Sequence, residues 1–188
     1  MKNEVYSERI QAQINATSDL IKILNILLLN VGKSDSKIAN VRVFREMENY
    51  LTESDIPVES ISVYSQPVKK QNVYTGICKA INFSLKRNMY PYTSGYNQIS
   101  YIDPSYTSIG ILVNGEFNAS RIDSKYMIEQ IKHKKDVLQA KLDRFEMDLS
   151  NFEDCARKYA NIKERLNNLK AEYGDSLFYA VRDIIGNI

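Results

Sequence analysis

Residues 128–173 read IEQIKHKKDVLQAKLDRFEMDLSNFEDCARKYANIKERLNNLKAEY, and in this stretch an apolar or aromatic side chain returns at every seventh position. Asp123 to Tyr173 contains no glycine and no proline, and Gly174 then supplies a normal signal for a helix end. A seven-residue repeat kept over this length is typical of a coiled-coil seam and predicts a very long C-terminal helix. The repeating positions are Ile131, Leu138, Phe145, Phe152, Tyr159, Leu166 and Tyr173.

The path and the packing partner of this helix stay open at the level of sequence. Ser150 and Glu153 match a capping box, so the chain could also fold back near this point as a helical hairpin. Lysines at the companion seam positions weaken a long parallel homodimer and favour either packing against residues 7–31, which we expect, or a short paired segment around Leu138 to Phe152. A homodimer through the C-terminal helix is the alternative. These lysines are Lys135, Lys163 and Lys170.

Two helices are predicted before the first proline-containing segment. Residues 3–31 lack glycine and proline and end at Gly32, and Leu20 to Val31 is apolar nearly all round, which indicates a helix buried on most sides. A second helix is predicted to begin after a cap at Asp35 or Ser36 and to end before Pro57. Its apolar residues recur at helical spacing: Ile38, Val41, Phe44, Met47 and Leu51.

The segment between residues 57 and 122 holds all four prolines and four of the seven glycines, and its periodicity is that of strands. In the run from Ile77 to Leu85, Ile81 and Phe83 are expected to face a core. Asn114-Gly115 predicts a hairpin turn between the last two strands. The predicted strands are 61–64, 77–85, 98–102, 108–113 and 116–122.

These elements define the expected fold class. It is α+β, with N-terminal helices and a very long, coiled-coil-like C-terminal helix or helical hairpin flanking an antiparallel β-meander. The expected segments are 1–56, 57–122 and 123–188, within one composite domain.

Composition favours a cytoplasmic protein without a membrane segment. The net charge is +2, and the two cysteines show no CxxC spacing. The N-terminus MKNEVYSERIQ has no apolar region typical of a signal peptide, and the run from Leu20 to Val31 is too short to span a bilayer. The abundant Lys, Ile, Asn and Tyr have A/T-rich codons, which favours a low-GC bacterium or a phage or mobile element growing in one.

No residue pattern predicts catalysis, a cofactor or a metal site. His133 is the only histidine and falls at a solvent-facing position between lysines. Gly32-Lys33-Ser34 lacks the earlier glycine that a phosphate-binding loop needs, because Leu27 stands there. We therefore predict that the protein is not an enzyme.

The stretch RNMYPYTSGYNQISYIDPSY at 87–106 is the strongest candidate for a binding site, and it lies in the only segment with a basic excess. Its tyrosines either cover the sheet or form a contact surface, since tyrosine is both a strand former and an interface residue. The candidate residues are Lys86, Arg87, Tyr90, Tyr92, Tyr96, Tyr101 and Tyr106.

Two functions fit this stretch. The first is a non-enzymatic protein-interaction or assembly module, with the extension that a phage or mobile-element protein binds and blocks a host macromolecule. The alternative is a single-stranded nucleic-acid binding protein, in which bases stack on the tyrosines and the nearby lysines and Arg87 contact phosphates.

Overall fold

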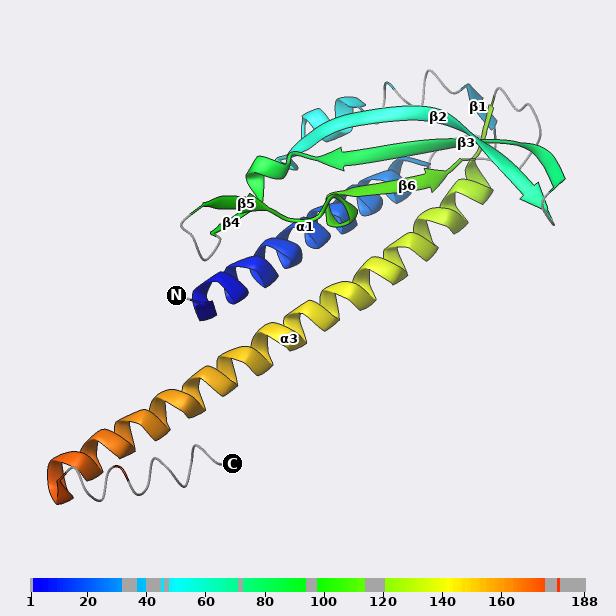
Figure 1. Cartoon of the computed structure of the whole chain (residues 1–188). Coiled ribbons are helices and arrows are strands. Elements are labelled where there is room, and N and C mark those ends of the chain that lie inside the picture. Colours follow the sequence, from blue (N-terminus) through cyan, green and yellow to red (C-terminus); the bar gives the residue numbers. More distant parts are fainter. Residues whose placement is uncertain are drawn as a thin grey trace. The chain divides into compact units, whose positions relative to one another are not determined.

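The computed structural model describes residues 2–31, 37–39, 45, 48–70, 73–93, 98–113, 121–174 and 179. The chain divides into two compact units, Met1–Glu146 and Met147–Ile188, and their boundary falls inside the last helix. The predicted α+β class is confirmed (Figure 1). The elements are α1 (Lys2–Val31), β1 (Lys37–Ala39), β2 (Val58–Lys70), β3 (Val73–Leu85), the 3-10 helix η1 (Arg87–Met89), β4 (Pro91–Thr93), β5 (Ile99–Tyr101), the 3-10 helix η2 (Pro104–Tyr106), β6 (Ser108–Leu112), β7 (Arg121–Asp123) and α3 (Ser124–Tyr173).

The main sheet is an antiparallel meander in the order β2-β3-β6. β3 pairs with β2 along its whole length but with β6 only from Ala80 to Ser84. The outer half of the β2–β3 hairpin therefore extends beyond β6 (Figure 1). The chain between β3 and β6 forms a separate two-stranded ribbon, β4–β5, which carries most of the tyrosine stretch.

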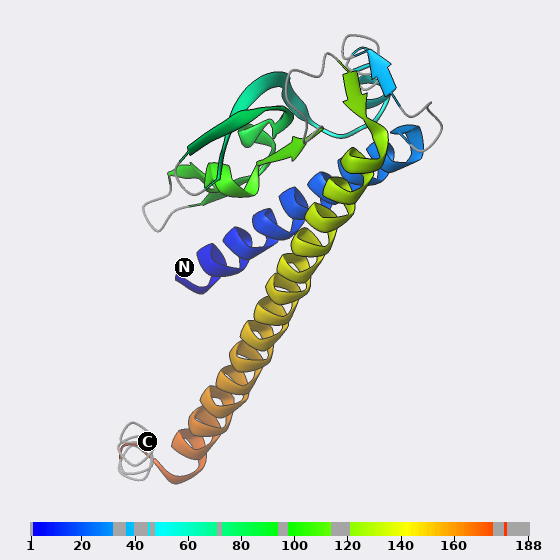
Figure 2. The same cartoon turned by 90° about the vertical axis from the view of Figure 1, so that its right-hand side faces the viewer.

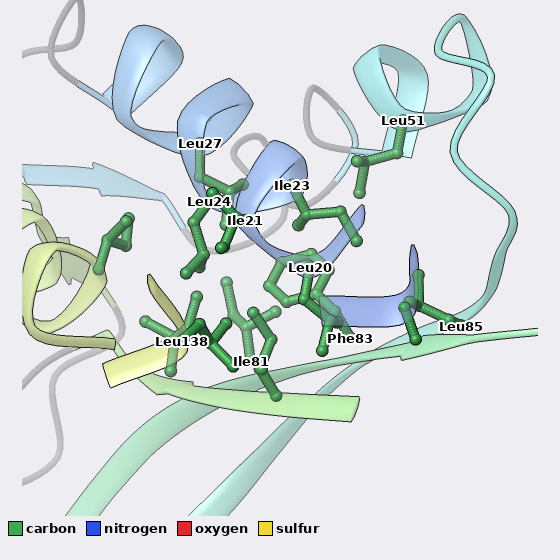
Figure 3. Close-up of a cluster of buried hydrophobic side chains, with 14 of the residues drawn as sticks. Leu20, Ile21, Ile23, Leu24, Leu27, Leu51, Ile81, Phe83, Leu85 and Leu138 are labelled. Carbon is green, nitrogen blue, oxygen red and sulfur yellow. The ribbon is translucent and has the colours of Figure 1, made fainter. Parts of the chain in front are cut away.

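The core of the first unit lies between the inner face of β3 and α1. The predicted alternation is confirmed, since Ile81, Phe83 and Leu85 are all buried. Leu20 and Leu24 of α1 lie against this face in Figure 3. The first part of α3 covers another side of α1, which explains why Leu20 to Val31 is apolar nearly all round (Figure 2). The buried residues from α3 are Met127, Ile131 and Leu138.

The prediction of a second helix is wrong at its beginning. Lys37–Ala39 forms β1 and pairs with β7, with Ile38 opposite Ile122. The partner strand lies more than eighty residues away, and its pairing overrides the local helical spacing. Arg45 and residues 48–52 are helical, residues 53–56 are described and are not helical, and residues 40–44, 46 and 47 lie outside the described residues.

The predicted hairpin at Asn114-Gly115 cannot be followed, because residues 114–120 lie outside the described part of the chain. The described end of its second strand is β7, which pairs with β1. β6 confirms the first strand, and it pairs with β3.

α3 is one continuous helix of 50 residues, so the hairpin alternative at Ser150 is wrong. Ser150 lies in the helix interior, where the heptad continues in phase and no glycine or proline interrupts it. In the first unit the seam residues Ile131 and Leu138 share a buried cluster with α1, as expected for packing within the chain. Further along, Tyr159 and Tyr173 are exposed, and whether this half forms a coiled coil with a second copy stays a prediction.

Gly174 ends α3 in a left-handed conformation, with φ of 80°, and its N–H donates to the carbonyl of Lys170 at 3.0 Å. We expect Gly174→Ala to destabilise this helix end by about 1–2 kcal/mol, because a Cβ is strained at positive φ. Hydrogen exchange of amides in the last turn of α3 should become faster, while amides around Ile131 should keep their protection. Unchanged exchange in the last turn would contradict this expectation.

The segment of α1 from Glu4 to Val31 is long and apolar enough to cross a membrane. Among the described helices, α1 is the one that meets this criterion of length and composition. A buried core helix passes the same test, and Ile23, Leu24 and Leu27 of α1 are fully buried against the sheet and α3. The location of the protein in the cell stays a prediction.

Candidate functional site

The β4–β5 ribbon divides the tyrosine stretch between two faces. Tyr92 pairs with Ser100, and Pro91 pairs with Tyr101. Because side chains alternate along a strand, Tyr92 and Ser100 share one face, while Pro91, Ile99 and Tyr101 share the other. The first pair is half-buried and the second group is exposed, so one face is turned inward and the other toward solvent.

The inner face of the ribbon packs against α1. The guanidinium carbon of Arg9 lies 6.0 Å from the centroid of the Tyr92 ring, within reach of a cation–π contact. The backbone N–H of Thr93 donates to the Glu8 carboxylate at 3.1 Å. These contacts orient β4 on the helix.

Tyr90, which precedes the ribbon, is a buried anchor and not an exposed ring. It is 4% exposed, and its hydroxyl donates to Asp19 Oδ2 of α1 at 2.5 Å. Lys22 Nζ lies 2.6 Å from the other oxygen of the same carboxylate. Burial, followed by the hydrogen bond and the charge of Asp19, raises the pKa of the Tyr90 phenol far above its usual range. Tyr90 therefore joins η1 and β4 to α1.

Tyr106 also faces inward. Its ring meets Phe145 of α3 edge to face, with centroids 5.5 Å apart, and Lys141 Nζ lies 5.8 Å from the centroid of the Tyr106 ring. Tyr106 therefore packs η2 against α3 within the first unit.

Asp103 fixes the start of η2 and marks a charged cluster beside the ribbon. Its carboxylate accepts the N–H of Ser105 at 2.8 Å, as an N-cap does. Hydrogen bonds from Ser105, and then the positive charges of Arg87 and Arg9, hold the pKa of this carboxyl below its usual value.

The outward side carries a group of exposed apolar residues that we call the outer apolar surface. Ile99 is 69% exposed and Tyr101 is 51% exposed, and the alternation of side chains places both on one face of β5. Pro91 completes the group and is also exposed. Large apolar side chains gathered in this way are unusual away from interaction sites.

The structure therefore separates the predicted site residues. Lys86, Arg87 and Tyr101 are exposed, as a contact surface requires. Tyr90, Tyr92 and Tyr106 pack inward, so for these three rings the structural interpretation of the tyrosines holds. Tyr96 lies outside the described residues. The prediction did not include Pro91 and Ile99, although the alternation of Ile99 and Tyr101 along one strand is visible in the sequence.

The His, Cys, Asp and Glu side chains among the described residues are not grouped as a metal site requires. No group of three or more His, Cys, Asp or Glu residues among them could hold a metal ion. His133 and Cys155 are both exposed on α3. The absence of enzymatic activity stays a prediction.

Comparison of the chain with protein families, with curated proteins and with solved structures finds no match.

Proposed function

We propose that the chain is a non-enzymatic protein-interaction module and that the outer apolar surface is its contact surface. One observation carries the proposal: Ile99 and Tyr101 face solvent together on a ribbon whose other face is fixed to α1. A rigid support lowers the entropy cost of association, since the side chains are already in place. Aromatic and aliphatic anchors of this kind often dominate the energy of protein interfaces.

The nucleic-acid alternative has weaker support. Base stacking needs accessible ring faces, but Tyr90 is buried, and the rings of Tyr92 and Tyr106 have contacts within the chain. Ile99 and Pro91 beside Tyr101 suit an apolar protein surface better than a phosphate backbone. If the alternative holds, single-stranded DNA binds at low salt and dissociates steeply as salt rises.

The finer proposal is that a phage or mobile-element protein uses this surface to block a host macromolecule in the cytoplasm. This finer proposal rests on the A/T-rich codons that the amino-acid composition implies. It predicts that the partner protein is found in the lysate of a low-GC bacterium. A homodimer through the exposed second half of α3 is compatible with this role, because that half lies outside the first unit.

The test is a pulldown from such a lysate with the wild type and with an Ile99→Asp/Tyr101→Asp variant. We expect the variant to lose at least about 30-fold in affinity for the captured protein, because two anchors of about 1 kcal/mol or more each are lost. Met147→Asp is the matched control, since Met147 is also exposed but lies on α3. Equal capture by the wild type and the double variant would contradict the proposal.

A further inference from the structure

A hollow lies at the start of β2, where the short helical segment 48–52 and the chain after it meet the beginning of the sheet. Its volume is about 520 Å³. The N–H of Lys86 donates to the carbonyl of Pro57 at 2.8 Å, which ties the end of β3 to the entry of β2. We call this hollow the β2 groove. It belongs to the first unit and lies apart from the residues that fix the ribbon to α1.

The floor of the β2 groove is apolar. Leu51 is buried in the core, and Ile56, Val58 and Ile61 are half-buried and pack against the same core. Ser54 ends the helical segment by donating its hydroxyl to the Leu51 carbonyl at 2.8 Å, which keeps that hydroxyl satisfied. The floor is therefore an outer side of the core that the described chain leaves accessible.

A β-bulge explains how β2 supplies both the floor and the rim. Val58 pairs with Leu85 and Ser60 pairs with Ser84, so Glu59 is an extra residue in the strand. A bulge of this kind redirects side chains. Val58 and Ile61, three residues apart, both pack toward the core, while Glu59 and Ser60 are exposed.

The rim of the groove is acidic. Glu48, Asp55 and Glu59 are exposed around it, and Lys86 is the one basic side chain in the lining. Within the described part of the chain, none of these three carboxylates forms a salt bridge. Three uncompensated carboxylates against one ammonium group give the opening a local negative field, although the segment as a whole is basic.

We propose that the β2 groove binds an apolar side chain on a lysine- or arginine-rich segment of the partner protein. The apolar floor would bury the side chain, and the carboxylates would attract its basic neighbours and disfavour acidic ones. The inference rests on the proposed function and adds the chemistry of the partner. Met89 also lines the groove and is 60% exposed, so it can add an apolar contact to the bound side chain.

The test uses three fluorescein-labelled peptides of equal length and the full chain. The first peptide carries one leucine flanked by lysines, the second replaces this leucine with serine, and the third replaces the lysines with glutamates. We expect the leucine–lysine peptide to bind saturably and at least tenfold more tightly than either of the others, with affinity that falls as salt rises. Equal binding of the serine peptide, or no saturable binding, would overturn the proposal.

Two sets of variants locate the binding. The variant Glu48→Lys/Asp55→Lys/Glu59→Lys reverses the rim charges and should weaken binding of the leucine–lysine peptide at least tenfold. Ile56→Ser keeps the charges and should also weaken binding of this peptide. The control makes the same change in net charge on exposed positions of α3 and should leave affinity within about twofold. Circular dichroism confirms that each variant folds. The control variant is Glu146→Lys/Glu153→Lys/Glu164→Lys.

The groove and the proposed function can fail separately. The Ile99→Asp/Tyr101→Asp variant should bind the leucine–lysine peptide as the wild type does, because its substitutions lie outside the groove lining. If peptide binding fails while capture of a protein still depends on Ile99 and Tyr101, only the groove proposal is wrong. If the peptide binds as expected but capture of a protein does not depend on Ile99 and Tyr101, the proposal for the outer apolar surface is wrong.

Discussion

Replacing Phe83 with alanine is expected to lower the free energy of unfolding by about 3–5 kcal/mol, the usual cost of removing a fully buried phenylalanine. Phe83 is fully buried in the middle of β3, and it shares one cluster with Leu20 and Leu24 of α1 (Figure 3). The substitution removes the ring at the point where the helix and the sheet meet, and the surrounding side chains can close the cavity only in part.

Urea denaturation followed by circular dichroism measures this loss. Tyr64→Ala is the control, because it removes an aromatic ring of similar size from an exposed position on the neighbouring strand β2. It should cost about 1 kcal/mol or less. If both variants lose the same free energy of unfolding, or if Phe83→Ala loses less than about 1 kcal/mol, α1 does not pack on the sheet as described.

Tyr90→Phe is expected to cost about 1–3 kcal/mol near neutral pH, because the Asp19 carboxylate loses its hydrogen-bond donor while its side chain is only 16% exposed. Phenylalanine keeps the ring in place, so the loss reports the hydroxyl and not the packing. Tyr101→Phe, at an exposed ring, is the control and should change stability by about 0.5 kcal/mol or less.

The effect of Tyr90→Phe should depend on pH in a defined direction. The pKa of Tyr90 is raised in the folded chain above its ordinary value of 10.0, so the stabilisation is complete below pH 10.0. As pH rises further, the unfolded phenol ionises while the folded one stays protonated, and the wild type loses up to about 1.4 kcal/mol per pH unit relative to the variant. The gap between wild type and Tyr90→Phe should therefore narrow above pH 10.0. A constant or widening gap would show that the Tyr90 phenol is not buried against Asp19 as described.

The parts of the fold that local patterns encode were predictable. The absence of glycine and proline, together with the seven-residue repeat, predicted α3 up to Gly174, and the alternation around Phe83 predicted the buried face of β3. β1 was not predictable in this way, because Ile38 pairs with Ile122 and no local signal marks so distant a partner. The capping box at Ser150 is a different case. It is a valid local signal for a helix start, but α3 continues through it because the heptad repeat runs on in phase.

The site was predictable only as a region. The composition pointed to the tyrosine stretch, but which rings are exposed depends on contacts far along the chain. Tyr90 is buried because Asp19, 71 residues away, accepts its hydroxyl, while Tyr101 faces solvent. Ile99 is not a tyrosine and so is not marked by composition, and it is strand β5 that places it beside Tyr101.

Site-specific photo-crosslinking in a low-GC bacterial lysate tests the interaction surface most directly. A photoreactive phenylalanine analogue is placed at Ile99, at Tyr101 or, as the control, at Met147, and crosslinked products are identified by mass spectrometry. The outer apolar surface predicts that the same protein is crosslinked from both Ile99 and Tyr101 and not from Met147. Crosslinks of equal yield from Met147, or no protein crosslinked from either ribbon position, would contradict it.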